Sequence, residues 1–363
     1  MVTGASTILI MAGGTGGHVF PALAVAEALR VQGHQIQWLG TRHGLEAEIV
    51  PRAGFDMNYI SVKGLRGNGM LGWLLAPFRL LFALTQALRI CLRLHPGVVL
   101  GMGGFVTGPG GVASWLLRRP LVVHEQNAIP GMTNRWLAKL ATRVLEAFPH
   151  SFKSSVAAQH TGNPVRKLIT AISAPNERYA SHQGAMRLLI IGGSLGAQAL
   201  NDIVPAAIAT LDKALCPTIW HQAGKQKNIT TARRYAECNL EARVEPFIVN
   251  MAEAYAWADL VICRAGAMTV AELSNVGLAS ILVPYPHAVD DHQTANARYL
   301  ADANAAILIR QVDLTATHLA AVLSDLLVAG RPRLLEMATI ARGLGKPDAT
   351  QAVAQICLEV VRE

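Results

Sequence analysis

The sequence lacks the features of several common protein classes. Its five cysteines are scattered and form no C-x-x-C pair, which argues against a disulfide framework and favours a reducing compartment. Charged residues make up only 15% of the chain against 52% for hydrophobic ones, so we expect no long disordered stretch. The apolar run near the N-terminus is too short for a secretion signal and continues into a glycine turn, so we interpret it as a strand.

Two nucleotide-binding signatures are also absent. The first glycine turn, GGTGGHV (residues 13–19), has a valine where the dinucleotide pattern G-x-G-x-x-G requires its third glycine. The next strand-like run, Gln35 to Arg42, lacks the acidic residue that would hold a ribose. Gly224-Lys225 has no glycine five residues earlier and is followed by Gln226, which excludes a Walker A loop. A nicotinamide or flavin is therefore disfavoured, and we predict no cofactor.

The sequence has fewer acidic residues than basic ones. The 32 lysines and arginines outnumber the 24 acidic residues, giving a formal net charge of +8. Such an excess favours an anionic partner, which could be a nucleic acid, a membrane surface or a phosphorylated substrate. Composition does not choose among the three.

Short β-rich runs alternate with helical patterns in two successive series, as is typical of parallel sheets flanked by helices. We predict an α/β architecture of two Rossmann-like domains, joined by residues 159–169 and the polar stretch 173–184. The tail from Arg331 is helical and could belong to either half. The first series has candidate strands at Thr7 to Ala12, Gln35 to Gly40, Asp56 to Val62, Val98 to Gly103, Leu121 to Glu125 and Arg143 to Phe148. The second has them within residues 186–193, 217–224, 259–266, 279–286 and 305–311.

One segment, Met70 to Leu94, breaks this alternation. It is long enough to span a bilayer, but its arginines make insertion costly. On a helical wheel Arg79, Arg89, Arg93 and Gln86 share one narrow arc, and the rest of the circumference is apolar. Two interpretations stay open: a helix at a membrane interface with its arginines at anionic headgroups, and a helix that packs between domains. The basic loop just before it, KGLRGNG, favours the membrane.

Three further glycine-rich turns follow candidate strands, at Gly101 to Gly111, Gly192 to Gln198 and Cys263 to Leu273. Glycine lets the backbone bend sharply, and the first N–H groups of the next helix point outward, so such a turn can cradle an anion. Ligands of open parallel sheets bind beyond the carboxyl ends of the strands, where these turns lie. Each turn alone is also explained by tight strand-to-helix packing. Their number and their division between two halves favour a ligand site.

The second half carries residues suited to a nucleoside diphosphate. Arg264 follows an apolar strand and Glu272 lies within the next helix, which suits a diphosphate and a ribose respectively. Gln293 could bond sugar hydroxyls. Asp290 and Asp291 are adjacent and do not form the D-x-D arrangement of a metal-bridged diphosphate, so we predict no metal.

His18 is the candidate base of the first half. It lies at the entry to a helix, whose positive end would keep an imidazole neutral and able to accept a proton. A lone histidine there is also explained as an ordinary helix-entry residue. Glu125 and Asn127, at another strand end, could offer a base or a sugar contact.

Eight motifs together resemble those of the MurG family, in the same order over nearly the whole chain. They are GGTGGHVFPALAVA, GLRG, GMGGFVTGPGG, HEQNAIPG, GNPVR, GGSLGA, CRAGAMTVAE and VPYPHAVDDHQTAN. Members of that family transfer N-acetylglucosamine from UDP to undecaprenyl-diphosphate-linked muramoyl-pentapeptide, the step from lipid I to lipid II in peptidoglycan synthesis. The resemblance implies a GT-B fold whose two parallel-sheet domains face a deep cleft, and inverting transfer without a metal.

The resemblance also implies a domain layout, a location and partners. Residues 1–164 would bind the acceptor and the membrane, residues 165–340 would bind UDP-N-acetylglucosamine, and the final helix, 341–363, would pack back on the N-terminal domain. The protein would attach peripherally to the cytoplasmic face of the bacterial inner membrane, bind its anionic surface, contact cell-wall or division proteins, and bind no nucleic acid.

The resemblance assigns roles residue by residue. His18 matches the histidine proposed as the base. Donor contacts fall at Thr15, Gly16, Gly17, Asn127, Arg166, Ser194, Ile248, Arg264, Ala267, Met268, Thr269, Glu272, His292 and Gln293. The acceptor diphosphate falls at Gly13, Gly14, Gly103 and Gly104, and membrane contacts fall at Leu71, Trp73, Leu74, Leu75, Phe78, Arg79, Phe82 and Arg89.

Two alternatives stay open beside this function. One is another UDP-sugar enzyme of the same fold, such as a UDP-N-acetylglucosamine epimerase, which needs no lipid acceptor. The other is a non-catalytic UDP-sugar sensor on the membrane, which would bind UDP and turn nothing over.

Overall fold

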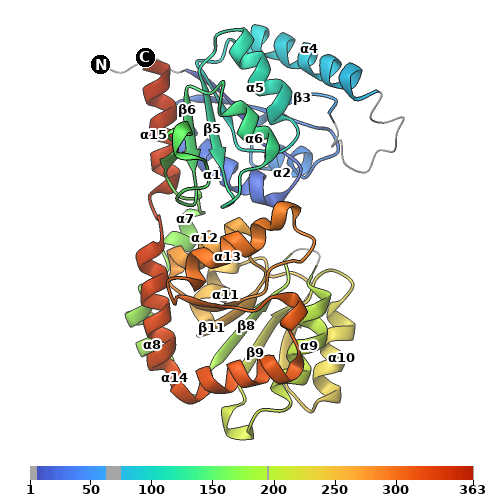
Figure 1. Cartoon of the computed structure of the whole chain (residues 1–363), viewed down its shortest axis with the longest axis vertical. Coiled ribbons are helices and arrows are strands. Elements are labelled where there is room, and N and C mark those ends of the chain that lie inside the picture. Colours follow the sequence, from blue (N-terminus) through green and yellow to red (C-terminus); the bar gives the residue numbers. More distant parts are fainter. Residues whose placement is uncertain (1–5, 63–74, 194–195, 363) are drawn as a thin grey trace. The chain divides into compact units, whose positions relative to one another are not determined.

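The computed structural model describes residues 6–62, 75–193 and 196–362. The chain divides into two compact units, one comprising Met1–Arg166 with Pro347–Glu363 and the other Lys167–Lys346 (Figure 1). Each unit contains one sheet, and the strand pairings in both sheets are parallel. The predicted α/β architecture of two Rossmann-like domains is therefore confirmed.

The sheet of the first unit has the strand order β3-β2-β1-β4-β5-β6-β7. Its strands are β1 (Thr7–Met11), β2 (Gln35–Gly40), β3 (Asp56–Tyr59), β4 (Val98–Gly101), β5 (Leu121–Glu125), β6 (Arg143–Glu146) and β7 (Gln159–His160). The chain builds outward in one direction from β1 and in the other from β4, so the order reverses between these two strands. Ligands of open α/β sheets bind beyond the carboxyl ends of the strands at such a switch point.

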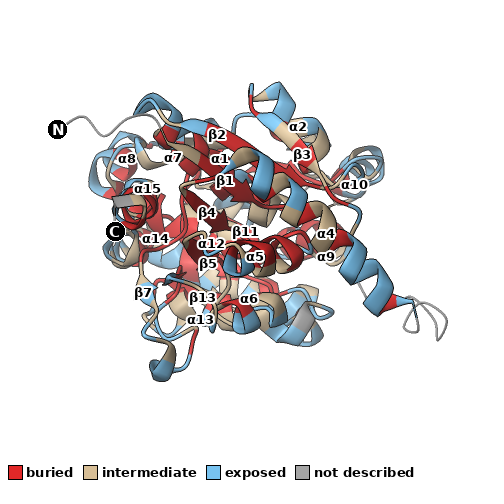
Figure 2. Ribbon diagram, turned by 90° about the horizontal axis from the view of Figure 1, so that it is seen from above, coloured by how far each residue is buried: buried red, intermediate tan, exposed pale blue. Residues whose placement is uncertain are grey.

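Helices cover both faces of the first sheet. They are α1 (Gly16–Val31), α2 (Glu46–Arg52), α4 (Ala76–Leu94), α5 (Thr107–Leu116), α6 (Met132–Leu137) and α15 (Ala349–Arg362). On one face α1 and α15 pack with alternate strand residues such as Ile8 and Leu100. On the other, α4, α5 and α6 pack with Leu9 and Val99. The strands are buried between these layers because both of their faces are apolar (Figure 2).

The second unit repeats the plan, with the strand order β10-β9-β8-β11-β12-β13 and its switch point between β8 and β11. Its strands are β8 (Arg187–Ile191), β9 (Thr218–Gln222), β10 (Ala242–Glu245), β11 (Leu260–Cys263), β12 (Ala279–Leu282) and β13 (Ala306–Leu308). Its helices are α7 (Lys167–Thr170), α8 (Pro175–Ser181), α9 (Gln198–Ile208), α10 (Asn228–Glu237), α11 (Met251–Trp257), α12 (Ala267–Val276), α13 (His292–Ala301) and α14 (Ala316–Leu344). In α14 the helix kinks at Gly330, whose φ is 76°.

The prediction that the polar stretch 173–184 is a linker is wrong. Pro175–Ser181 forms α8, which packs on α14 within the second unit. Tyr179 is buried in the core and donates a hydrogen bond of 2.5 Å to the carbonyl oxygen of Asp259. Arg178 is buried as well and donates to the carbonyl of Val276 at 3.2 Å. The Tyr179 hydroxyl and the end of the Arg178 guanidinium thus bond main-chain oxygens inside the unit, which composition alone does not reveal.

Candidate functional site

Two glycine turns meet at the switch point of the first sheet. One follows β1 and the other follows β4, where Gly103 and Gly104 have φ values of 98° and 89°. A Cβ atom added to Gly103 would lie 2.5 Å from Nδ1 of His18, and one added to Gly104 would collide with the carbonyl oxygen of Gly13. The turns therefore pack too closely to admit side chains. The structure brings together the predicted base and the glycines predicted for the acceptor diphosphate.

A buried carboxylate that sequence reasoning missed lies against the first of these turns. Glu46, in α2, is 0% exposed and accepts hydrogen bonds from the N–H of Gly14 at 2.9 Å and from the N–H and hydroxyl of Thr41 at 2.9 and 2.8 Å. The Gly14 amide is thus already used by the protein. The amides of residues 15–17, where α1 begins, make no hydrogen bond with any residue that the structure describes. These are the amides that an anion can use.

The ring of His18 is hydrogen-bonded into the interior of the first unit. Its Nδ1 atom lies 2.9 Å from Oε1 of Gln126, whose Nε2 atom lies 3.1 Å from Nδ1 of His124. His124 is 0% exposed, and its Nε2 atom lies 2.9 Å from the carbonyl oxygen of Gly162. Burial lowers the pKa of His124 to about 4, so this ring is neutral at physiological pH.

The carboxylate of Glu125 shapes the loop after β5. It is 2% exposed and accepts from the N–H and side-chain amide of Asn127 at 2.9 and 3.2 Å. It also accepts from the Asn134 side chain at 2.8 Å and from the Gly131 N–H at 3.1 Å. These bonds hold Asn127, a predicted donor contact, half-buried at the end of β5. Arg166, another predicted donor contact, is exposed at the end of the first unit's main segment.

In the second unit Arg264 follows β11 at the switch point. Its Nη1 atom donates to the carbonyl oxygens of Val283 at 3.1 Å and Pro284 at 3.2 Å, and its Nη2 atom donates to Oε1 of Gln311 at 2.6 Å. The guanidinium also lies 5.6 Å from the ring centre of Tyr285. Partial burial lowers the pKa of Arg264 from its ordinary value. Three of its five N–H groups fix its place, and the other two make no hydrogen bond with a residue that the structure describes.

The predicted donor residues of the second unit surround this edge of its sheet, whereas Thr15, Gly16 and Gly17 lie in the first unit. Ala267, Met268 and Thr269 form the first turn of α12, and Glu272 in the next turn accepts from the Tyr255 hydroxyl at 2.9 Å. His292 begins α13, and Gln293 beside it accepts from the Tyr285 N–H at 2.9 Å. Ile248, after β10, is 2% exposed and donates its N–H to Gln222 at 3.1 Å. Ser194 lies outside the described residues.

Helix α4 fully buries only small side chains; some of its large apolar ones, such as Leu84 and Leu88, pack partly against the core, and others are largely exposed. Ala76, Ala83, Ala87 and Cys91 face the unit. Phe78 and Phe82, in contrast, are 71% and 55% exposed, and Leu81 is 60% exposed. A helix that served only to pack would place its large apolar side chains inward, because they gain most from burial. Leu75, Arg79 and Arg89 are exposed as well. The predicted membrane residues Leu71, Trp73 and Leu74 lie outside the described residues.

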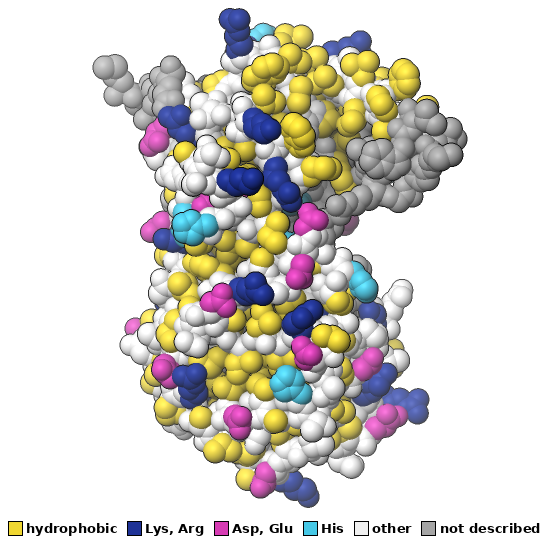
Figure 3. All heavy atoms as spheres, in the orientation of Figure 1, with side chains coloured by type: hydrophobic (Ala, Val, Ile, Leu, Met, Phe, Trp, Pro, Cys, Tyr) yellow, Lys and Arg dark blue, Asp and Glu magenta, His cyan; other side chains and the backbone are white. Residues whose placement is uncertain are grey.

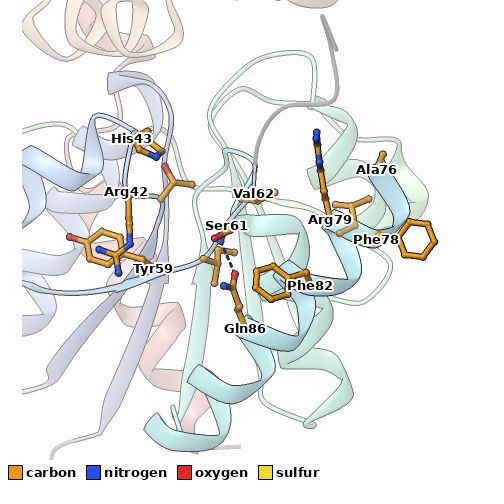
Figure 4. Close-up of a pocket in the computed structure, with 13 residues that line it drawn as sticks. Arg42, His43, Tyr59, Ser61, Val62, Ala76, Phe78, Arg79, Phe82 and Gln86 are labelled. Atoms are coloured by element: carbon orange, nitrogen blue, oxygen red, sulfur yellow. Dashed lines mark hydrogen bonds between the residues drawn. The ribbon is translucent and has the colours of Figure 1, made fainter. Parts of the chain in front are cut away.

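The arginine arc of this helix is partly tied to the unit. Gln86 accepts from the N–H of Ser61 at 2.7 Å, and Arg93 donates to Oδ1 of Asn58 at 2.5 Å. Between α4 and the chain beyond β2 and β3 lies a cavity of about 670 Å³. Figure 4 shows Phe78, Arg79 and Phe82 on one side of it, opposite Arg42, His43 and Tyr59. The cavity thus combines aromatic walls with cationic side chains.

Further apolar side chains extend this exposed surface. Trp115 in α5 is 51% exposed and Trp136 in α6 is 65% exposed. Figure 3 shows apolar side chains gathered over α4 and α5, with lysines and arginines nearby. Within residues 6–62, 75–193 and 196–362, none of the helices has the length and apolar character that a membrane crossing requires. The described part of the chain also contains no group of three or more His, Cys, Asp or Glu that could hold a metal ion.

Two family models match the chain. Residues 8–146 match the glycosyltransferase family 28 N-terminal domain, and residues 187–353 match the glycosyltransferase family 28 C-terminal domain.

Among curated proteins, two with the same name are similar over nearly their full length: the UDP-N-acetylglucosamine--N-acetylmuramyl-(pentapeptide) pyrophosphoryl-undecaprenol N-acetylglucosamine transferases of Alkalilimnicola ehrlichii and Nitrosococcus oceani. The first is 56% identical over 98% of this chain and 99% of its own, and the second 54% identical over 97% and 98%. Among solved structures, the crystal structure of Acinetobacter baumannii MurG superposes with a TM-score of 0.86 at 41% identity, covering 98% of this chain and 99% of that one.

Proposed function

The chain belongs to glycosyltransferase family 28 and, within it, to the MurG transferases, and from this premise we propose that it transfers N-acetylglucosamine from UDP to the 4-hydroxyl of an undecaprenyl-diphosphate-linked muramoyl-pentapeptide. The single structural observation that supports this chemistry is the contact between the His18 ring and the paired glycine turns of the first unit. It joins a proton acceptor to a backbone surface suited to a phosphorylated ligand.

The first unit binds the acceptor in this proposal. Its diphosphate lies at Gly13, Gly14, Gly103 and Gly104, of which Gly14 has open space where a side chain would stand. Because Glu46 already takes the Gly14 N–H, the free amides of residues 15–17 do most of the anion binding there, to the acceptor or to the donor. His18 takes the proton of the acceptor hydroxyl as its oxygen attacks the anomeric carbon.

The second unit binds the donor. Arg264 and the first-turn amides of α12, at Ala267, Met268 and Thr269, hold the diphosphate, while Glu272 bonds the ribose and the backbone at Ile248 contacts uracil. As the new glycosidic bond forms, the bond between the anomeric carbon and the phosphate oxygen breaks, and UDP leaves with that electron pair. Arg264 and the helix start stabilise the charge that develops on the phosphate. Attack opposite the leaving group inverts the configuration to β.

The surface of α4 binds the cytoplasmic face of the inner membrane. Exposed Phe78 and Phe82 enter the headgroup region, and Arg79 and Arg89 pair with anionic lipids. Trp115 and Trp136 widen the contact, since tryptophan is enriched at membrane interfaces. This places the acceptor unit at the surface where a lipid-linked substrate resides, alongside cell-wall or division proteins that bind there.

The direct test is transfer of radiolabelled N-acetylglucosamine from UDP to a short-chain analogue of the lipid-linked muramoyl-pentapeptide, in excess EDTA. Labelled disaccharide product is expected, and the same mixture without acceptor is the control. Product that requires added magnesium would contradict metal-independent transfer. Label that stays on the nucleotide in both conditions would contradict the transferase, and isomerised sugar would point to an epimerase.

A further inference from the structure

The His18 ring is the first member of a chain of hydrogen bonds that runs into the core of the first unit. Gln126 and His124, the next two members, lie at the end of β5 and are 1% and 0% exposed. This series of hydrogen bonds ends on the carbonyl oxygen of Gly162. Because this series of buried side chains ends on a group that can only accept, it can determine which nitrogen of each histidine carries the proton.

The proton positions follow from the far end of this chain. A carbonyl oxygen only accepts, so His124 must carry its proton on Nε2, 2.9 Å from the Gly162 oxygen. Since the ring is neutral, its Nδ1 atom holds a lone pair. His124 is therefore an acceptor toward Gln126.

The amide of Gln126 is oriented in turn. Its Nε2 atom faces two acceptors, Nδ1 of His124 at 3.1 Å and the carbonyl oxygen of His124 at 3.2 Å. The flipped amide would place Oε1 against both of them, with no proton between. Oε1 therefore faces His18 at 2.9 Å, and only a protonated Nδ1 of His18 can bond it.

We propose that Gln126 and His124 are positioning residues that hold His18 in its Nδ1–H tautomer and so keep Nε2 as the lone pair that accepts the proton of the acceptor hydroxyl. This inference rests on the proposed function, in which His18 is the base. After transfer the ring is an imidazolium whose Nδ1–H still bonds Gln126. The Nε2 atom makes no hydrogen bond with a described residue, so it is open to substrate.

The tautomer matters because a free histidine side chain favours the Nε2–H form. Without the chain of bonds, His18 would mostly carry a proton on the nitrogen that has to accept one. Gly103 contributes as well, since an added Cβ would lie 2.5 Å from Nδ1 and displace the ring from Gln126.

The tautomer can be measured without any turnover, by ¹⁵N NMR of the full chain labelled at histidine, with His18→Gln identifying the signals of His18. We expect the Nδ1–H form in the unmodified protein and a shift toward Nε2–H in Gln126→Leu. Gln126→Glu reproduces this pattern as the neutral carboxylic acid, which burial favours, with its O–H toward His124 and its C=O toward Nδ1 of His18, and should retain the Nδ1–H form. The matched control is Gln37→Leu, because Gln37 is another buried glutamine of the first unit, bonded through both ends of its amide to Asp56 and Asn58.

Kinetics give the second readout. Gln126→Leu should lower kcat about 10- to 100-fold, part of the roughly 10² to 10⁴ that a general base is worth, with KM for the UDP donor unchanged. Gln126→Glu should recover most of kcat, and Gln37→Leu should retain it. A Gln126→Leu protein with an unchanged tautomer or with full kcat overturns the inference. Failure of the proposed function is a separate result, namely no transfer by the unmodified chain.

Discussion

In the first unit the candidate base is held by side chains, whereas in the second unit the candidate diphosphate ligand is held mainly by main-chain atoms. His18 reaches Gln126 and then His124 through side chains alone. Arg264 is held instead by the carbonyl oxygens of Val283 and Pro284, together with one side chain. The two sheets have the same kind of switch point, so the difference lies in the residues at the two switch points and not in the topology.

The difference corresponds to two chemical tasks. A proton acceptor must stay neutral, and the first unit surrounds His18 with uncharged partners while the charge of Glu46 is satisfied by N–H and hydroxyl donors. A leaving diphosphate needs fixed positive charge, and the second unit fixes Arg264 with oxygens that cannot neutralise it. The following predictions test this contrast, from the largest expected effect to the smallest.

The largest effect is expected in the first unit. His18→Gln removes the base and should lower kcat by about 10² to 10⁴, because glutamine cannot take the hydroxyl proton. Steady-state transfer at saturating donor and acceptor measures it. UDP affinity, measured by calorimetry, should not change, and near-normal turnover would exclude His18 as the base.

In the second unit we expect the opposite pattern. Arg264→Gln should weaken UDP binding about 10- to 100-fold, because a charge-assisted hydrogen bond contributes roughly 1.5–3 kcal/mol. Calorimetry with UDP measures this loss, and Arg298→Gln, an exposed arginine of α13, is a surface control. Unchanged affinity in Arg264→Gln would remove this residue from the nucleotide site.

Acid should destabilise both units alike, because each contains a buried histidine whose pKa is lowered. Burial lowers the pKa of His124 to about 4 and that of His221, in the second unit, to about 3, from 6.5 in the unfolded chain. Between these values and 6.5 the unfolded state binds more protons, so stability is present above pH 6.5 and falls as the pH drops. We expect each histidine to cost about 2 kcal/mol at pH 5 relative to pH 7.5.

Urea unfolding at the two pH values measures this loss. His221→Gln should reduce the pH dependence of the second unit and leave that of the first. Equal pH dependence in the variant and the unmodified chain would contradict the assignment.

The smallest effect concerns the membrane surface, which only the first unit carries in this proposal. The double change Phe78→Glu and Phe82→Glu should weaken binding to anionic vesicles about tenfold, since it removes two exposed aromatic rings and adds negative charge. Co-sedimentation with such vesicles measures it. Val312→Glu with Val328→Glu, exposed in the second unit, is the matched control. Undiminished vesicle binding by the protein with Phe78→Glu and Phe82→Glu would indicate that α4 serves only to pack against the unit.

The strands were predictable where an apolar run ends at a glycine turn. β1, β8 and β11 show this pattern, because strands buried on both faces need apolar residues throughout. β10 has no such run, since ARVE is half-exposed and carries two charges. Its place comes from pairing with β9, which a local pattern does not encode.

The candidate site was predictable where its residues stand in local motifs next to strands. His18, Arg264 and Glu272 follow strands and stand in recognisable motifs. Glu46 contacts a residue 32 positions away and Gln126 one 108 positions away, so only the fold brings them to the turns. Gln126 could have been noted as a polar residue directly after a buried strand end, but nothing local distinguishes Glu46.

On α4 the periodicity identified the polar arc and left the rest of the helix ambiguous, since almost every other position is apolar. Side-chain size resolved it in the structure. The small residues Ala83 and Ala87 allow close approach to α5, while Phe78, Leu81 and Phe82 are left outside.

Helix α15 has a consequence for how the protein is made. It follows the whole second unit in sequence, yet Val353 and Cys357 belong to the same core cluster as Ile8 and Leu100 of the first unit's strands. During synthesis the first unit's nascent core therefore remains uncovered while all of Lys167–Lys346 is translated. The second unit, being continuous, can fold on the ribosome before the first is complete. Synthesis of α15 is then the step that completes the core of the first unit.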